Sequence, residues 1–245
     1  MEKTDMIYGT RAVMEAILAG KTIERIMIQS GLNNDLIKEL IHTAKNNKVQ
    51  IAFVPPEKLQ RMSSRNHQGV ICLLSSVSYS SIENVIDRAF SEGREPFLLL
   101  LDRVTDVRNF GAIARTAECA GVDSIVIAEK GNAPISSDAM KTSAGALNHL
   151  AVCREADLKK TLKLLRDSGI RVVACTEKTN KDLYDVNLTG PIAIIVGSEE
   201  DGISDELLRD ADELARIPMK GKIGSLNVSV AAGVAVYEVT RQRSK

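Results

Sequence analysis

The chain has 245 residues, 44% of them apolar and 3% aromatic, and its 32 basic side chains balance 32 acidic ones. A chain of this size and composition folds into one large domain or two smaller ones, and its neutrality excludes an indiscriminate polycation. Its longest apolar runs, 97–101 and 192–196, are shorter than the about 20 residues of a membrane span. The four cysteines form no CxxC pair, and the first ten residues lack the apolar core of a secretory signal. We therefore expect a cytoplasmic protein with reduced thiols and no membrane association.

The first part of the chain alternates short helical and strand patterns. Helices are expected from Thr10 to Gly20, over 34–46 and after Pro55, and strands over 23–29, 50–54 and 70–74. These segments predict a small α/β domain over residues 1–75. Ser75–Ser81 has five serines in seven residues and no charge, which is typical of a linker. With the expected helix 82–91, it makes residues 76–94 a connecting segment.

Residues 95–245 form a longer series of the same kind. Strands are expected over 97–102, 124–128, about 149–153, 171–176, 192–197 and 214–218, and helices over 110–120, 136–146, 158–167, 204–211 and 226–241. The strands are nearly continuous apolar runs, as in parallel sheets that helices cover on both faces. The fold class is thus α/β with a doubly wound parallel sheet, in which ligands bind beyond the carboxyl ends of the strands.

The first unusual strand end is 102–117. Asn109 stands where an N-cap is expected, and Gly111 and Ala112 leave the first helical turn open to a close neighbour. Arg115, on this small-residue helix, could grip a phosphate bidentately. The plain alternative is a surface arginine paired with Asp106 or Glu118.

The second unusual strand end is 192–204, in which three acidic residues, 199–201, lie between Gly197 and Gly202. The Lys-Ser/Thr pair of a phosphate-binding P-loop is missing after Gly202, and three carboxylates repel an anion. The segment therefore favours a neutral or cationic ligand. An acidic start to the next helix is the alternative, although it does not explain both glycines.

The third unusual segment is 216–238. Ser225, Asn227 and Ser229 crowd the start of the expected helix 226–241, and they offer more hydrogen-bonding groups than one cap needs. The excess indicates binding. The helix itself has almost no polar face, so it packs either deep in the domain or against a second subunit.

The three histidines, His42, His67 and His149, are scattered, and no cluster of residues has metal-ligand spacing. We therefore expect structural or surface histidines and no metal. His67, in a polar turn beside Arg61 and Arg65, is kept as a candidate RNA contact.

Taken together and in this order, the three segments resemble the SpoU (TrmH) family of RNA ribose 2′-O-methyltransferases, of the SPOUT superfamily. Residues 109–115 match its motif NxGxxxRxA, and 194–202 match a strand followed by GxExxG. Residues 217–238 match IPMxGxxxSLNVSxAAxxxxYE almost letter for letter. The first 75 residues resemble the small substrate-binding domain of the bacterial members that methylate a guanosine of 23S ribosomal RNA.

The resemblance implies features that spacing cannot give. The second and third motifs would form a deep C-terminal trefoil knot, an exception to the rule that chains do not thread loops. S-adenosylmethionine would bind there, at Gly197, Ile217 and Leu226, with Met219, Thr176 and Ser225 as neighbours. Members are homodimers through the last helix and the knot. The functional residues carried over are Asn109, Arg115, Glu199, Ser225, Asn227 and, less directly, Ser229.

The reaction moves a methyl group from a sulfonium to a ribose 2′-oxygen, so alignment of the hydroxyl and acceptance of its proton matter most. A guanidinium is effectively never deprotonated in proteins, which argues against Arg115 as the base. We expect Arg115 to hold the target phosphate while Glu199, Ser225 and Asn227 fix the loop and the hydroxyl.

Two alternatives remain open: a transfer RNA substrate, and an RNA-binding assembly factor that retains the cofactor pocket without chemistry. Residues 1–80 hold ten Lys or Arg against seven Asp or Glu, an excess of three that the rest of the chain cancels. Affinity for RNA should therefore come from local cations. The candidates are Arg61, Arg65, Arg108, Arg115, Lys220 and Lys222.

Overall fold

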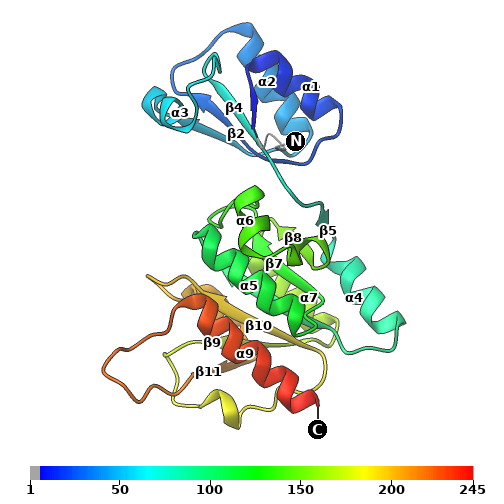
Figure 1. Cartoon of the computed structure of the whole chain (residues 1–245). Helices are drawn as coiled ribbons and strands as arrows, with labels where there is room; N and C mark the ends of the chain where they lie inside the picture. The colour runs from blue at the N-terminus through cyan, green and yellow to red at the C-terminus, as the bar shows by residue number, and fades with distance from the viewer. Residues whose placement is uncertain (1–5, 245) are drawn as a thin grey trace. The chain divides into compact units, whose positions relative to one another are not determined.

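The structure is a computed structural model that describes residues 6–244. The chain divides into two compact units. The first holds the residues up to Ser78 together with Pro134–Ser137, and the second holds Tyr79–Ala133 and the chain from Asp138 onward. Figure 1 follows the chain through both units.

The first unit is built on a four-stranded sheet in the order β1-β4-β2-β3 (Met6–Tyr8, Val70–Leu74, Ile23–Gln29, Ile51–Val54). Only the β2–β3 pair is parallel. Helices α1 (Thr10–Leu18) and α2 (Asp35–Asn46) bury apolar side chains against one face, and α3 (Pro56–Met62) places Leu59 on the other. Asn34 caps α2 by accepting a hydrogen bond from the Ile37 N–H, as expected of an N-cap.

The second unit is built on a seven-stranded sheet in the order β11-β9-β10-β6-β7-β8-β5, and each pair is parallel. The strands are β5 (Tyr79–Ser80), β6 (Phe97–Asp102), β7 (Ser124–Ala128), β8 (Ala151–Glu155), β9 (Arg171–Cys175), β10 (Ile192–Gly197) and β11 (Glu213–Ala215). The predicted parallel sheet is thus confirmed. The chain runs outward from β6 on one side and places β10 and β9 on the other, so the strand order switches beside β6.

Helices cover both faces of this sheet. Helices α4 (Ile82–Ser91), α7 (Leu158–Asp167) and α8 (Asp205–Asp210) pack into one apolar cluster with side chains of the central strands. Helices α5 (Val107–Cys119) and α9 (Val228–Arg243) lie side by side in Figure 1 and contact each other, and α9 also contacts β10. Within residues 6–244, no helix is long and apolar enough to cross a membrane.

Several expected elements are placed or bounded differently. β1 and β5 were not expected, and β5 lies inside the serine-rich linker, where Tyr79 pairs with Val152 of β8. The expected helix 136–146 is a short helix, α6 (Ser137–Thr142), followed by a 3₁₀ turn (Ala146–Asn148), and β8 begins at Ala151. Strands of two or three residues are too short to show a sequence pattern, and their pairing with distant strands is not visible in the local sequence, so β1 and β5 were not predicted.

The last helix is also exposed where burial on all sides was expected. Val230 and Tyr237 are each about half exposed, at 51% and 50% of their surface, and Val234 on the same side is only partly buried. Ala232, Ala235, Val236 and Val239 face the core. Of the two expectations for this helix, packing deep within its own domain is therefore wrong for one face.

Candidate functional site

The candidate site lies where the strand order of the second sheet reverses. β10 and β6 run side by side and end together, with Gly197 opposite Asp102 in the register. Beyond Gly197 the chain turns back sharply, and the backbones of Ser198 and Gly202 pair through two hydrogen bonds of 3.1 Å. A Cβ atom on Gly197 would lie 2.1 Å from the Gly202 carbonyl carbon, so only glycine fits there.

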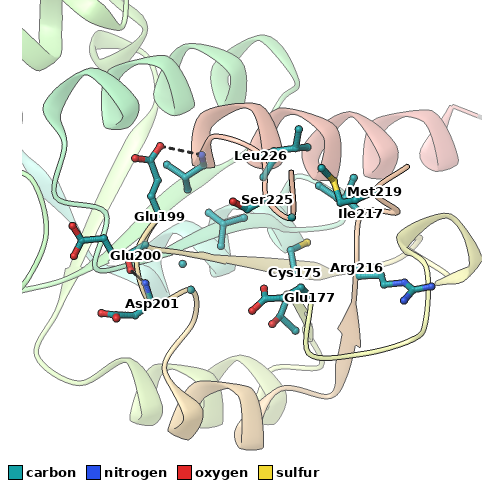
Figure 2. Close-up of a pocket in the computed structure, with 18 residues that line it drawn as sticks. Cys175, Glu177, Glu199, Glu200, Asp201, Arg216, Ile217, Met219, Ser225 and Leu226 are labelled. Carbon is teal, nitrogen blue, oxygen red and sulfur yellow. Dashed lines mark hydrogen bonds between the residues drawn. The ribbon is translucent and has the colours of Figure 1, made fainter. Parts of the chain in front are cut away.

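A first cavity of about 360 Å³ opens at the ends of β9 and β10. Figure 2 shows Glu199, Glu200 and Asp201 at one end of it and Ile217 and Met219 at the other. Every residue expected to contact the cofactor lines this cavity: Thr176, Gly197, Ile217, Met219, Ser225 and Leu226. The structure thus brings together residues from three strand ends and the segment before α9.

The sequence reading missed other residues that line the first cavity. Cys175, Glu177 and Arg216 belong to the strand ends β9 and β11, and Val228 and Ala231 belong to the first turn of α9. In the sequence, only their position next to the predicted cofactor-contact residues could have indicated them. Burial raises the pKa of the Cys175 thiol to about 12, which keeps it protonated and makes it a poor nucleophile.

Three motif side chains form one hydrogen-bonded cluster. The Asn109 Nδ2 group donates to Oε1 of Glu199 at 3.0 Å, and the Asn227 Nδ2 group donates to the same oxygen at 2.5 Å and to Oδ1 of Asn109 at 3.1 Å. The Val228 N–H also points to Glu199 Oε1 at 3.5 Å, the dashed line of Figure 2. One carboxylate therefore joins α5, the loop after β10 and the start of α9.

Asn227 fulfils two tasks at once. As the N-cap of α9, its Oδ1 accepts hydrogen bonds from the backbone N–H and the hydroxyl of Ser229, while its amide group serves the cluster. Ser225 lines the first cavity but does not join this cluster. The polar residues at the start of α9 thus have three different roles: capping the helix, forming the cluster and lining the first cavity.

The start of α5 corrects one expectation. Asp106, and not Asn109, is the N-cap, because its Oδ1 accepts from the N–H groups of Arg108 and Asn109 at 2.7 and 3.0 Å. The Asn109 and Arg108 N–H groups hold the pKa of Asp106 below its usual value. Asn109 lies in the first turn, which leaves its side chain free to reach Glu199.

A second cavity, of about 340 Å³, adjoins the first and shares its wall at Ser198, Glu199, Glu200, Asp201 and Val228. Its remaining lining includes Arg103, Thr105, Asp106, Asn109 and Gly131. Glu199 thus lies at the boundary between two open spaces and Asn109 lines the second, whereas Asn227 lines neither and reaches the boundary through its hydrogen bonds to them. Such a boundary suits the reacting atoms of two ligands.

The expected cations do not line these cavities, although Arg108 precedes the lining residue Asn109 in the chain and Lys220 follows the lining residue Met219. Arg108, Arg115, Lys220 and Lys222 are exposed. Within the described residues, no salt bridge joins Arg115 to Asp106, Glu118 or any other residue. Arg115 is therefore a surface arginine without the expected acidic partner. The Arg115 guanidinium is available for a ligand.

The first unit carries the other expected RNA contacts. Arg61 and Arg65 are exposed, and the Arg65 guanidinium lies over the Tyr8 ring, 5.5 Å from its centroid. Nδ1 of His67 accepts a hydrogen bond from the Gly69 N–H, which orients the ring in the turn before β4. The Nδ1 atom of His67 therefore has a structural role within the turn, and Nε2 is the ring nitrogen left to contact RNA.

Metal ligands and disulfides do not enter the site. Between residues 6 and 244, no three His, Cys, Asp or Glu side chains gather as a metal site would need. Cys72, Cys119, Cys153 and Cys175 are all free thiols.

Comparisons with known proteins identify the family. Residues 96–237 match the SpoU rRNA Methylase family, and residues 6–80 match the family described as RNA 2′-O ribose methyltransferase substrate binding. A TrmH family tRNA/rRNA methyltransferase of Staphylococcus saprophyticus is 33% identical over 98% of this chain and 96% of its own length. One of Bacillus subtilis is 31% identical over 99% of this chain and 98% of its own.

Solved structures agree with this result. An AdoMet-bound rRNA methyltransferase from Sinorhizobium meliloti is 25% identical, covers 96% of this chain and 86% of its own, and has a TM-score of 0.60. A TrmH/SpoU tRNA modifying enzyme of A. aeolicus is 28% identical with a TM-score of 0.55, but it covers only 66% of this chain and 84% of its own. The chain belongs to the SpoU methylase family of RNA 2′-O-ribose methyltransferases.

Proposed function

We propose that this protein transfers a methyl group from S-adenosylmethionine to the ribose 2′-hydroxyl of a guanosine in 23S ribosomal RNA. The observation that carries the proposal is the hydrogen-bonded cluster of Asn109, Glu199 and Asn227, in which Glu199 lines both of two adjoining cavities. One cavity would hold the methyl donor and the other the target nucleotide.

The first cavity has the chemistry that S-adenosylmethionine needs. This cofactor supplies an activated methyl group on a positively charged sulfur. Ile217, Met219 and Leu226 offer an apolar surface suited to a flat adenine ring, while Glu199, Glu200 and Asp201 make the opposite wall acidic. Carboxylates attract a cation and repel a phosphate, so the wall favours this cofactor over a nucleotide cofactor. Thr176, Gly197 and Ser225 would add polar and backbone contacts.

The cluster residues would position the ribose. Asn109 and Asn227 are amides, which neither supply nor accept a proton at neutral pH, so they orient. Glu199 accepts hydrogen bonds at Oε1, and its second carboxylate oxygen would accept the proton of the 2′-hydroxyl. Ser225, on the cavity wall, would contact the same region.

Arg115 would hold a phosphate of the target. Its guanidinium is exposed on α5, the same helix that carries Asn109. A planar guanidinium binds phosphate through two parallel hydrogen bonds, and a lysine ammonium does not. We expect Arg115→Lys to lower turnover at least tenfold under saturating RNA. Near-normal turnover of this variant would disprove the bidentate grip.

Ribosomal RNA is favoured over transfer RNA by the extent of the matches. The rRNA methyltransferase structure covers 96% of this chain, and the tRNA-modifying structure covers 66%. The part that the shorter match leaves out fits the size of the first unit, where Arg61, Arg65 and His67 would contact RNA, with Arg108, Lys220 and Lys222 near the cavities. The four free thiols fit the reducing cytoplasm, where the RNA resides.

We propose that two copies pair through α9 and that the loops around the site form a trefoil knot. Val230, Val234 and Tyr237 give α9 an apolar side that this chain leaves uncovered. Residues of the second and third motifs, among them Gly197 and Leu226, line one cavity, as the two segments of such a knot would. Analytical ultracentrifugation should give a dimer mass that Val230→Asp shifts towards monomer, and tracing residues 176–228 in an electron-density map tests the knot.

Two measurements test the function. Calorimetric titration should detect S-adenosylmethionine binding to the wild-type chain. Radiolabelled methyl transfer should then modify 23S ribosomal RNA taken from a strain that lacks the gene, and the product should be one 2′-O-methylguanosine. Methylation of transfer RNA alone would favour the second substrate, and binding without transfer to either RNA would favour the assembly factor.

Asn227→Ala provides the matched site variant. It removes the amide that joins Glu199 and Asn109 and also an N-cap, which costs about 1 kcal/mol of stability. Asn227→Ser keeps a capping oxygen without the amide, so it separates the two tasks. We expect both variants to lower methyl transfer at least tenfold, and full activity of Asn227→Ser would contradict the role of the cluster.

A further inference from the structure

We propose that Arg103 is a positioning residue, which holds the acidic loop 198–202 in the shape that cofactor binding requires. The inference rests on the proposed function, because the first cavity is taken as the cofactor site. Arg103 is absent from the three motifs and lines only the second cavity. Its effect on the first cavity would therefore pass through the loop.

The loop needs an external support. Glu199, Glu200 and Asp201 are consecutive carboxylates, and all three are exposed at the walls of the cavities. Neighbouring like charges repel, so the turn is electrostatically unfavourable by itself. The backbone pair between Ser198 and Gly202 closes the turn but does not neutralise it.

Arg103 reaches this turn from the end of β6. Its Nη1 pairs with Oδ2 of Asp201 at 3.2 Å, and its Nη2 donates to the Gly202 carbonyl oxygen at 3.1 Å. Its Nε lies 3.4 Å from Oδ1 of buried Asp102, and the other oxygen of Asp102 accepts from the Ser204 N–H at 2.7 Å. Arg103 and Asp102 thus fasten the C-terminal end of the loop, at Asp201, Gly202 and Ser204, to the end of β6.

The backbone conformation of Arg103 is strained. Its φ of 58° is in the left-handed region, which costs a residue with a Cβ atom about 1 kcal/mol and costs glycine almost nothing. The backbone alone would therefore favour glycine. The contacts of the arginine side chain with the loop give a physical reason for arginine at this strained position.

The loop connects this support to the chemistry. Glu199, two residues before Asp201, holds Asn109 and Asn227, and Gly202 lies against Gly197 in the cofactor wall. Release of Asp201 and the Gly202 carbonyl would let the carboxylates move apart. The cavity wall and the Glu199 carboxylate would then occupy the required position only part of the time.

The decisive variant is Arg103→Gly, because it removes the side chain and relieves the backbone strain together. We expect the full chain to stay folded, because the relieved strain offsets part of the lost contacts, while the dissociation constant for S-adenosylmethionine rises about tenfold. Arg103→Lys should give an intermediate rise, since one ammonium cannot replace three guanidinium contacts. Arg88→Ala is the control, because it removes an exposed arginine that pairs with Glu92 on α4.

A double-mutant cycle separates positioning from general stability. If Arg103 acts through the loop, Asp201→Asn should weaken cofactor binding less than Arg103→Gly does, and the double variant should bind no worse than Arg103→Gly alone. Wild-type affinity in a folded Arg103→Gly variant, or in Arg103→Lys should the glycine variant not fold, overturns the inference. If the wild-type chain does not bind S-adenosylmethionine at all, the proposed function fails and this inference fails with it.

Discussion

Gly197 is a position at which the site depends on the absence of a side chain. Its hydrogen occupies the place where a Cβ would meet three backbone atoms: the Gly202 carbonyl carbon at 2.1 Å, its oxygen at 2.3 Å and the Ile203 nitrogen at 2.3 Å. Backbone atoms cannot rotate away as a flexible side chain can. The turn after β10 must therefore move if any other residue is placed there.

Gly197→Ala should consequently abolish cofactor binding while most of the fold survives. We expect the dissociation constant for S-adenosylmethionine to rise at least a hundredfold, because the displaced loop carries the acidic wall. Isothermal titration calorimetry measures this directly, and circular dichroism reports the fold. Retained affinity in a folded variant would contradict the geometry at Gly197.

Gly233→Ala is a matched control for that substitution. Its new Cβ would lie 3.6 Å from Cγ2 of Thr116, an ordinary contact, in the interior of α9. Alanine favours a helix over glycine by about 0.5–1 kcal/mol, so stability should rise slightly. Cofactor affinity should stay at the wild-type value.

The elements themselves were predictable to the degree that their signal is local. β6 and β10 are unbroken apolar runs, and the structure confirms both within the expected bounds. The start of α5 was misplaced because Asp106 and Asn109 both suit an N-cap, and only the hydrogen bonds decide between them. β5 depends on β8, some seventy residues away, which no window of sequence contains.

The site follows the same rule. Asn109, Glu199 and Asn227 could be selected from their motifs, yet the hydrogen bonds that join them cross distances in sequence of up to 118 residues. The role of Arg103 could not be predicted from the sequence. It depends on a left-handed backbone conformation and on contacts with a loop about a hundred residues later in the chain. Sequence identifies the reactive residue types, and the fold alone identifies their supports.

The end of α9 provides an element-scale prediction. Arg243, in its last turn, donates to three backbone carbonyls: Glu95 at 3.2 Å, Pro96 at 3.1 Å and Gly190 at 2.6 Å. Its guanidinium also lies 5.1 Å from the centroid of the Phe97 ring. These contacts fix the helix to the beginnings of β6 and β10, and so position the cap at the other end of the same helix.

Arg243→Ala should therefore destabilise the second unit by about 2–3 kcal/mol, because charged hydrogen bonds to partly buried carbonyls are lost. Urea unfolding followed by fluorescence or circular dichroism gives the free energy of unfolding. Arg88→Ala, which removes an exposed ion pair of α4, should cost less than about 0.5 kcal/mol. Equal effects of the two substitutions would show that the Arg243 contacts contribute nothing special.

At the scale of the whole molecule, neutrality limits how RNA can be held. With 32 basic and 32 acidic side chains, affinity must come from local cations, and we expect six exposed ones to contact RNA: Arg61, Arg65, Arg108, Arg115, Lys220 and Lys222. Each contact with a single-stranded phosphate contributes about −0.7 to the slope of log affinity against log salt. Three to six contacts therefore predict a slope of about −2 to −4.

Filter binding of the RNA between about 50 and 300 mM salt measures that slope. Lys222→Ala should reduce its magnitude by about 0.7, with little change in the affinity for S-adenosylmethionine. Lys163→Ala, an exposed lysine position on α7, is the control and should leave the slope unchanged. A slope near zero would contradict an electrostatic contribution to RNA binding.

Because of their buried thiols, both units should lose stability as the pH rises into the alkaline range. Burial raises the pKa of Cys72 in the first unit to about 12 and that of Cys153 in the second to about 11. The folded state therefore favours the neutral thiol, and its pKa exceeds that of the unfolded chain, which is about 8.5. The stabilisation is complete below about pH 8.5 and is lost as the pH rises towards 11–12.

Each thiol should cost about 1.4 kcal/mol of unfolding free energy per pH unit above this threshold, because the unfolded chain ionises first. Urea unfolding at pH 8, 9 and 10 measures the loss. Cys72→Ala should lower stability at pH 8, since it leaves a small cavity, but should flatten the pH dependence of the first unit. Cys119→Ala, at an exposed cysteine, should leave that dependence as it is in the wild-type chain. An unchanged slope in Cys72→Ala would mean that burial of this thiol does not govern the alkaline loss.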